Sequence, residues 1–306
     1  MRDARVAELA ARQFNRVSRQ QLHDLGMSDD AIAHRVATGR FAIVEENVLA
    51  VAPVLEHDDW GRWMAATLTA PGSVLTHFSA AAAAGYWAPA RPYETVTRPG
   101  SGGPRRIGGL LVFRSSTLQG ECTELRGIPI TAPARTVLDL AAHISERALA
   151  RAVRDVVRLD LATIATFADC LGRHHGRRGA RRLGLAIARY TGLPIERARS
   201  GAEVRALEIL RDAGYELPAL NKRIAGEEAD LSWGPQRRIV EIDGGPFHLD
   251  VGEDARKEAA WRAEGWDVSR VSADDVYGRP DRLLDCCANA ERPGVSAIPR
   301  TLGRSC

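Results

Sequence analysis

Two short segments with alternating apolar and polar residues, EEADLSW at 227–233 and RRIVEIDG at 237–244, constrain the fold of this chain most strongly. Their alternation is typical of strands with one buried face. The intervening residues GPQ suit a tight turn. The pattern therefore predicts an antiparallel hairpin, in which successive side chains point to opposite faces.

The register of this hairpin decides where its acidic residues lie. Pairing of Trp233 with Arg238 across the turn places Asp230 opposite Glu241, with β-carbons about 5 Å apart. Asp243 shares the face of Glu241, so three carboxylates converge. Opposed like charges weaken a sheet unless a cation or proton intervenes, and carboxylates are ligands that Mg²⁺ prefers. We therefore expect Asp230, Glu241 and Asp243 to be metal ligands; the alternative is a solvated acidic face.

The segments around the hairpin predict helices and a further strand. SGAEVRALEILRDAG at 200–214 is an amphipathic helix with an N-cap serine and a terminal glycine. Glu203 in its first turn completes a capping box with Ser200, or serves an active site, and the two roles are compatible. A second helix is expected from Asp254 to Glu264, closed by Gly265, and WDVSRV adds a strand to the sheet.

These residues carry a family resemblance. The chain from about Arg199 to Leu284 contains, in order, RS-x-x-E, an Asp-containing strand, E-x-D-G, a histidine, an Asp-x-x-basic helix and G-W-x-V-x-R. It resembles the endonuclease-like domain related to very-short-patch repair enzymes, within the PD-(D/E)XK superfamily. The resemblance implies a restriction-endonuclease-like mixed sheet flanked by helices. It makes Glu203 the helix acid, Asp230 the metal-bridging aspartate and Glu241 the second metal ligand.

One position departs from the superfamily pattern. Asp243 stands where a catalytic lysine is usual, and Lys257 on the next helix, near Arg256, is the nearby residue that supplies a replacement. His248 is a candidate for moving a proton or contacting phosphate, and its alternative is an ordinary surface residue. Mg²⁺ or Mn²⁺ is expected only if the site is catalytic.

The first fifty residues predict three helices and a hairpin. Helical patterns occur in VAELAARQ, SRQQLHDLG and SDDAIAHRVATGR, followed by the alternating FAIVEENVLAV, with Ser18 and Ser28 as N-caps. This layout is typical of a winged helix-turn-helix, whose third helix presents His34, Arg35 and Arg40 to DNA. The alternative is a generic three-helix packing unit.

A second resemblance covers the N-terminal 140 residues. The strings LxxxGMSxxAIxxRVxxGRF, SAAAAAGYW and GIPITAPARTVLDLA resemble abortive-infection antitoxins of type IV toxin-antitoxin systems. That resemblance implies a winged helix that binds promoter DNA, followed by a second domain. His77 and Ser79 receive no catalytic role, because no third orienting group is evident and Ser79 suits a helix N-cap.

Charge and composition indicate the kind of partner, the cellular compartment and whether the chain could cross a membrane. Residues 171–200 hold eight arginines and two histidines against one acid, so Arg177, Arg178 and Arg181 are expected to contact DNA. The five cysteines lack C-x-x-C spacing, which favours a reducing, cytoplasmic compartment. The N-terminus has no apolar signal core, and no segment has the roughly 20 apolar residues of a membrane span.

The whole chain is thus expected to be α/β (α+β) and to divide into a series of regions. These are a winged helix-turn-helix at 1–53, an α+β domain at 54–145, a helical basic connector at 146–198, an endonuclease-like domain at 199–285 and a loose tail at 286–306. We expect a DNA-binding protein with a metal-dependent endonuclease domain. The alternatives are a non-catalytic transcriptional regulator or antitoxin, with a cognate toxin or a second copy as partner, and a protein-interaction module.

Overall fold

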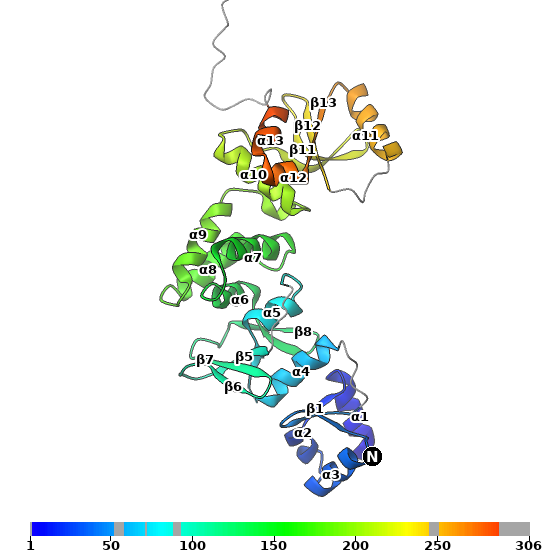
Figure 1. Ribbon diagram of the computed structural model, residues 1–306, viewed down its shortest axis with the longest axis vertical. Coiled ribbons are helices and arrows are strands. Elements are labelled where there is room, and N and C mark those ends of the chain that lie inside the picture. Colours follow the sequence, from blue (N-terminus) through cyan, green and yellow to red (C-terminus); the bar gives the residue numbers. More distant parts are fainter. Residues whose placement is uncertain (1, 52–57, 71, 88–92, 245–250, 288–306) are drawn as a thin grey trace, which may run out of the picture. The chain divides into compact units, whose positions relative to one another are not determined.

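The computed structural model describes residues 2–51, 58–70, 72–87, 93–244 and 251–287 (Figure 1). The chain divides into two compact units, Met1–Ala188 and Arg189–Cys306. Helices and three β-sheets occur together, which confirms the mixed α+β class. His248 and the tail beyond Cys287 lie outside the described residues.

The N-terminal region contains the predicted helices and hairpin. As predicted, Ser18 and Ser28 cap their helices through their side chains, and Gly26 and Gly39 adopt positive φ angles after these helices. A strand before the second helix was not predicted; it pairs with β3 in a three-stranded sheet of order β1-β3-β2. The elements are α1 (Arg2–Arg12), β1 (Arg16–Ser18), α2 (Arg19–Asp24), α3 (Asp29–Ala37), β2 (Ala42–Glu45) and β3 (Val48–Ala50).

The middle of the first unit is built on a six-stranded mixed sheet of order β6-β7-β5-β4-β9-β8. Helices α4 and α5 pack against this sheet, and Trp63, Leu75, Val96 and Ile128 belong to the shared core. The elements are α4 (Asp59–Thr69), β4 (Val74–Leu75), α5 (His77–Ala83), β5 (Glu94–Pro99), β6 (Arg105–Ile107), β7 (Leu110–Ser115), β8 (Cys122–Leu125), β9 (Ile128–Thr131) and α6 (Pro133–Leu140).

The sequence led us to expect Ser79 as the N-cap of α5, and this prediction is wrong. Thr76 precedes the helix, and Ser79 lies within it. The Ser79 hydroxyl donates to a Glu94 carboxylate oxygen at 2.6 Å and accepts from the Thr95 N–H at 2.8 Å. The serine therefore fastens α5 to β5, a long-range contact that a local pattern does not reveal.

A buried ionic network stabilises the same unit. Arg135 is fully buried and donates through Nε to Asp139, four residues on, at 3.0 Å. Arg177 donates to the same carboxylate at 2.7 Å, and both arginines also bond the Ser115 hydroxyl. Buried charges need such partners, because an unpaired ion in the interior is strongly destabilising. Helices α7 (Glu146–Arg158), α8 (Ile164–Arg173) and α9 (Ala180–Tyr190) follow, and the division between the units falls within α9.

The second unit is a four-stranded mixed sheet of order β10-β11-β12-β13 with helices on both sides (Figure 1). Strands β10 to β12 are antiparallel and β13 runs parallel to β12, which requires the crossover through α11. The elements are η1 (Ile195–Arg197), α10 (Gly201–Asp212), β10 (Ala219–Ile224), β11 (Glu227–Trp233), β12 (Arg238–Asp243), α11 (Val251–Ala263), β13 (Asp267–Ser272), α12 (Ala273–Gly278) and α13 (Pro280–Cys286).

Packing of α11 against the sheet sets the position of the charged residues near it. Trp261 is fully buried against Ile239 and Val268, and its indole N–H donates to the Ile224 carbonyl at 3.1 Å. Lys257 lies one turn earlier on the same helix face. The buried Trp261 thus fixes the face of α11 that packs against the sheet. It therefore also determines that Lys257 lies on this face.

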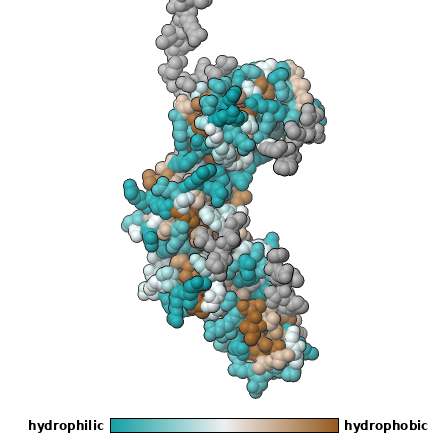
Figure 2. Space-filling view, in the orientation of Figure 1, coloured by the Kyte–Doolittle hydropathy of each residue, from teal (hydrophilic) through white to brown (hydrophobic). Residues whose placement is uncertain are grey.

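The surface in Figure 2 is mainly hydrophilic, with a hydrophobic patch over the N-terminal region. Ile43, a large apolar residue of β2, is 61% exposed. Within the described ranges, the helices are all too short or too polar to cross a bilayer.

Candidate functional site

Asp230 and Glu241 face each other across the hairpin formed by β11 and β12. The pairs Leu231 with Val240 and Trp233 with Arg238 confirm the predicted register, which places these acids opposite one another. The Asp230 N–H donates to a Glu241 carboxylate oxygen at 2.9 Å, and the Ile242 N–H donates to an Asp230 carboxylate oxygen at 2.8 Å. At this point the two side chains, rather than the main-chain carbonyls, accept the strand N–H groups.

Both carboxylates bind protons more tightly than ordinary acids. Burial, followed by the charges of Glu203 and Asp243, raises the pKa of Asp230 to about 6, although the Ile242 hydrogen bond opposes the shift. Burial and the charge of Asp230 raise the pKa of Glu241 to about 7. The two carboxylates are therefore close together and partly buried, so their negative charges repel each other unless a proton or a cation binds there.

Glu203 approaches the pair from α10. Its side chain is 5% exposed and accepts hydrogen bonds from the Arg199 N–H at 2.9 Å and from the Asn221 amide at 2.8 Å. Ser200 caps the helix by accepting from the Glu203 N–H at 3.1 Å. Glu203 thus takes part in the helix start and also lies close enough to Asp230 to raise its pKa.

Asn221 is a residue of this site that sequence reasoning missed. The pairs on either side of it, Leu220 with Leu231 and Lys222 with Ala229, place Asn221 across from Asp230 on β10. Its φ angle of 49° is left-handed, a conformation that asparagine tolerates better than most residues. Its amide also donates to the Arg197 carbonyl at 2.8 Å. The segment of Asn221 has no clear strand alternation, so the sequence offered no signal for this residue.

Asp243, the third predicted metal ligand, lies close enough to Asp230 for its charge to raise the pKa of that acid, but it is ion-paired. Its carboxylate receives Arg270 at 3.1 Å, and Arg270 also contacts Asp254 at 3.1 Å and Glu258 at 3.5 Å. Arg270 is paired with Glu241 in the parallel register of β12 and β13, and its charge lowers the pKa of Glu241. A basic side chain therefore lies beside the second acid, but it comes from β13 rather than from position 243.

Lys257 supplies a further positive charge near the two acids. It lowers the pKa of both Asp230 and Glu241, and its ammonium group is 3.6 Å from Glu253 on the same helix. Arg256 turns instead to Glu227, at 3.2 Å. The structure thus brings Lys257 close to the acid pair and directs Arg256 to the start of β11.

Asp230 and Glu241 provide some, but not all, of the ligands that a hard cation such as Mg²⁺ requires. Asp230 and Glu241 offer oxygen ligands whose mutual repulsion a divalent ion would remove. Among the described residues, however, these two acids form no group with a third carboxylate, histidine or cysteine in which all ligand atoms lie within 4.8 Å of one another. The remaining positions around a bound ion would therefore belong to water or a phosphate, as Mg²⁺ commonly permits.

The three N-terminal residues expected at DNA differ in their surroundings. His34 on α3 and Arg40 after it are exposed. Arg35 is half-buried, pairs with Asp3 of α1 at 2.7 Å and lies 6.0 Å from the Phe41 ring. A pocket of about 530 Å³ is lined in part by Arg35 and Arg40. Arg35 therefore links α3 to α1, while the other two side chains are open to a partner.

The basic residues of the predicted connector also divide into two kinds. Arg177 belongs to the buried network with Asp139, whereas Arg178 and Arg181 are exposed. Of these three arginines, Arg178 and Arg181 present their charge on the surface.

Comparisons with known proteins give little further guidance. No model of a known protein family matches the chain, and no curated protein matches it. Among solved structures, the chain is similar to the catalytic domain of the homing endonuclease I-Bth0305I, at 17% sequence identity and a TM-score of 0.26, over 29% of this chain and 93% of that domain. A likeness of this extent does not define an activity.

Proposed function

We propose that the second unit is a metal-dependent nuclease-type domain that hydrolyses phosphodiester bonds in DNA. The observation that carries this proposal is the opposed pair of Asp230 and Glu241, held in place by backbone N–H groups and raised in pKa. Such a pair is destabilising in a sheet unless a proton or a cation relieves the repulsion, and a bound cation would do so at neutral and alkaline pH. Its position in a mixed sheet flanked by helices agrees with the resemblance to the PD-(D/E)XK superfamily.

In this proposal Asp230 and Glu241 would hold Mg²⁺ or Mn²⁺, which when bound supplies Lewis acidity and lowers the pKa of water. Glu203, fixed by Asn221, strengthens the negative potential around Asp230. Lys257 stabilises negative charge that develops on a phosphate oxygen, because a preorganised cation acts strongly in a partly buried site.

Cleavage assays test the proposal directly. Supercoiled plasmid, nicked plasmid and single-stranded DNA are incubated with the protein and Mg²⁺ or Mn²⁺. We expect Asp230→Ala to lower the rate by about 100-fold or more. Asp212→Asn removes an exposed acid at the end of α10 and should cleave like the wild type. Equal cleavage by wild type and Asp230→Ala would remove the acid pair from the mechanism.

The N-terminal region supports a second element of the proposal, a winged helix-turn-helix that binds DNA. Its order of helices, the hairpin of β2 and β3, and the exposed His34 and Arg40 support this role. The region would deliver the nuclease unit to duplex DNA.

A non-catalytic regulator or antitoxin is the second candidate. The pairing of Asp243 with Arg270 favours it, because both groups are neutralised where the superfamily usually offers a free lysine. Under this alternative the protein binds promoter DNA but cleaves none of the three substrates with either metal. A binding assay on the same preparation separates this outcome from an unfolded protein.

A further inference from the structure

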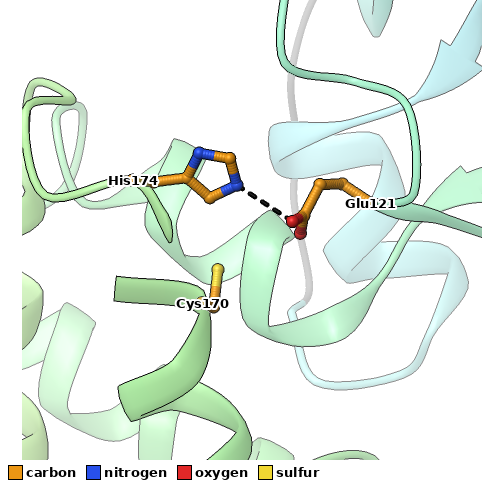
Figure 3. Close-up of side chains that lie close together, drawn as sticks. All are labelled: Glu121, Cys170 and His174. Atoms are coloured by element: carbon orange, nitrogen blue, oxygen red, sulfur yellow. Dashed lines mark ion pairs between the residues drawn. The ribbon is translucent and has the colours of Figure 1, made fainter. Parts of the chain in front are cut away.

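A second group of ligand-type side chains meets inside the first unit, in a different part of the chain from the acid pair. Glu121, Cys170 and His174 each have a ligand atom within 4.8 Å of those of the other two (Figure 3). The three residues are 6%, 1% and 7% exposed. They are therefore buried together, although 49 residues separate the first from the second.

The fold explains how the three come together. Cys170 lies in the last turn of α8 and His174 is its C-cap, so a spacing of four residues puts both on one side of the helix end. Glu121 immediately precedes β8, and its carbonyl accepts from the Ala132 N–H at 2.9 Å. The edge of the six-stranded sheet thus meets the end of α8.

The imidazole of His174 is incompletely satisfied. Its Nε2 atom lies 3.0 Å from Glu121 Oε1, yet this buried atom has no hydrogen-bond partner of acceptable geometry in the described part of the chain. A buried polar atom without such a partner is costly. Figure 3 shows this nitrogen, the carboxylate and the Cys170 sulfur directed toward a common point.

The chemistry of the three ligands selects a class of cation. A thiolate, an imidazole and a carboxylate together are typical of Zn²⁺, whereas Mg²⁺ and Ca²⁺ prefer oxygen ligands alone. The negative charges of a thiolate and a carboxylate also balance a divalent ion in a buried site. Arg173 donates to both Glu121 oxygens, at 2.8 and 3.4 Å, which is how outer residues orient a ligating carboxylate.

We propose that Glu121, Cys170 and His174 bind Zn²⁺, with a fourth position left to water, and that the ion ties the end of α8 to the start of β8. The competing explanation is an ion-pair cluster of Glu121 with Arg173 and His174 that holds no metal. The two explanations differ in what they predict for the sulfur of Cys170, which an ion-pair cluster does not use.

Cobalt titration of the full chain, stripped with a chelator, tests the site. Co²⁺ reports a thiolate ligand through a charge-transfer band in the near ultraviolet. The titration is done in an Asp230→Asn, Glu241→Gln background, so that the acid pair does not contribute. We expect one equivalent of Co²⁺ with the band, displaced by Zn²⁺, and affinity lowered by about tenfold or more in His174→Ala and Glu121→Gln.

Two neighbouring residues give matched controls. Cys170→Ser should abolish the band, whereas Cys122→Ser, the exposed cysteine beside Glu121, should keep it. His175→Ala, beside His174, should bind as the parent does. Absence of the band in the parent protein overturns the proposal, and so does a band that survives Cys170→Ser. Should Cys170→Ser fail to fold by circular dichroism, the isosteric Glu121→Gln decides, since unchanged Co²⁺ affinity there also overturns it.

Discussion

The carboxylates of Asp230 and Glu241 each accept a backbone N–H from the strand that carries the other, at 2.8 and 2.9 Å respectively. These hydrogen bonds fix both carboxylates before any ligand arrives, and a bound group would find its partners already oriented. Preorganisation of this kind is what a binding or catalytic site requires. The same arrangement brings the negative charges of Asp230 and Glu241 close together, and their repulsion affects the stability of the protein.

The stability of the metal-free protein should fall as the pH rises from about 4 to about 7. Both pKa values are raised in the folded state, to about 6 and about 7, so the folded protein binds more protons than the unfolded chain in this window. This contribution to the free energy of unfolding is present at acidic pH and is lost as the pH rises through these pKa values, a change of up to about 6 kcal/mol for the pair. Urea unfolding of wild type and Asp230→Asn, Glu241→Gln protein measures it; parallel profiles would contradict it.

Mg²⁺ should raise the melting temperature of the wild type more at pH 8 than at pH 5.5. Protons compete with the cation for Asp230 and Glu241, because metal ligands must be deprotonated. At 100 times its dissociation constant a ligand stabilises the folded state by about 2.7 kcal/mol. Differential scanning fluorimetry follows the shift, which Asp230→Asn should abolish and Asp212→Asn should preserve. An equal shift in Asp230→Asn would place the cation elsewhere.

Replacement of Lys257 by alanine should slow cleavage by about 100-fold, while Lys257→Arg should retain part of the rate. The chain has one other lysine, the exposed Lys222 on β10, and Lys222→Ala is the matched control. Single-turnover rates at saturating metal isolate this step from metal affinity. If both alanine variants cleave equally, the charge on α11 has no part in the reaction.

Asn221→Gly should lower the free energy of unfolding by about 1 kcal/mol, because the amide contacts with Glu203 and Arg197 are lost. Glycine keeps the left-handed backbone without strain, so this variant isolates the side chain. Asn221→Ala should lose about 1 kcal/mol more, through its φ of 49°. Denaturant titrations give both values, and a glycine variant as stable as the wild type would show that the amide contributes nothing.

Removal of the Arg40 side chain should weaken binding to duplex DNA and reduce its salt dependence by about one counterion, if the proposed winged helix contacts phosphate. Arg12→Ala is the control, since Arg12 is exposed on α1 and paired with Glu8. Fluorescence anisotropy at several salt concentrations gives both quantities. Identical salt slopes for the two variants would argue against α3 as the DNA-facing helix.

The sequence predicted those features that depend on neighbouring residues. The alternation of 227–244 specified the hairpin, its register followed from pairing Trp233 with Arg238 across the turn, and the serines before the second and third helices specified their caps. Each of these follows from a local period or a single cap hydrogen bond. The positions of Asp230 and Glu241 could therefore be placed opposite each other before the structure was known.

Contacts between distant segments could not be predicted in this way. Strand β10 lacks a clear alternation, so neither it nor Asn221 was expected. Asp243 was assigned to the acid cluster from strand alternation alone, which did not reveal its ion pair with Arg270, 27 residues later. Only the parallel pairing of β12 with β13 brings these two residues together.

The buried network around Asp139 changes how the basic stretch at 171–200 should be understood. Arg177 and Arg182 donate to groups inside the first unit, and Arg173 neutralises Glu121. Arg189 similarly neutralises the buried Glu208 in the second unit. Arginines that hold a protein's interior together contribute little long-range attraction to a polyanion. The electrostatic field that a nucleic acid would sense here is weaker than a count of basic letters suggests, and Arg178 and Arg181 account for much of what remains.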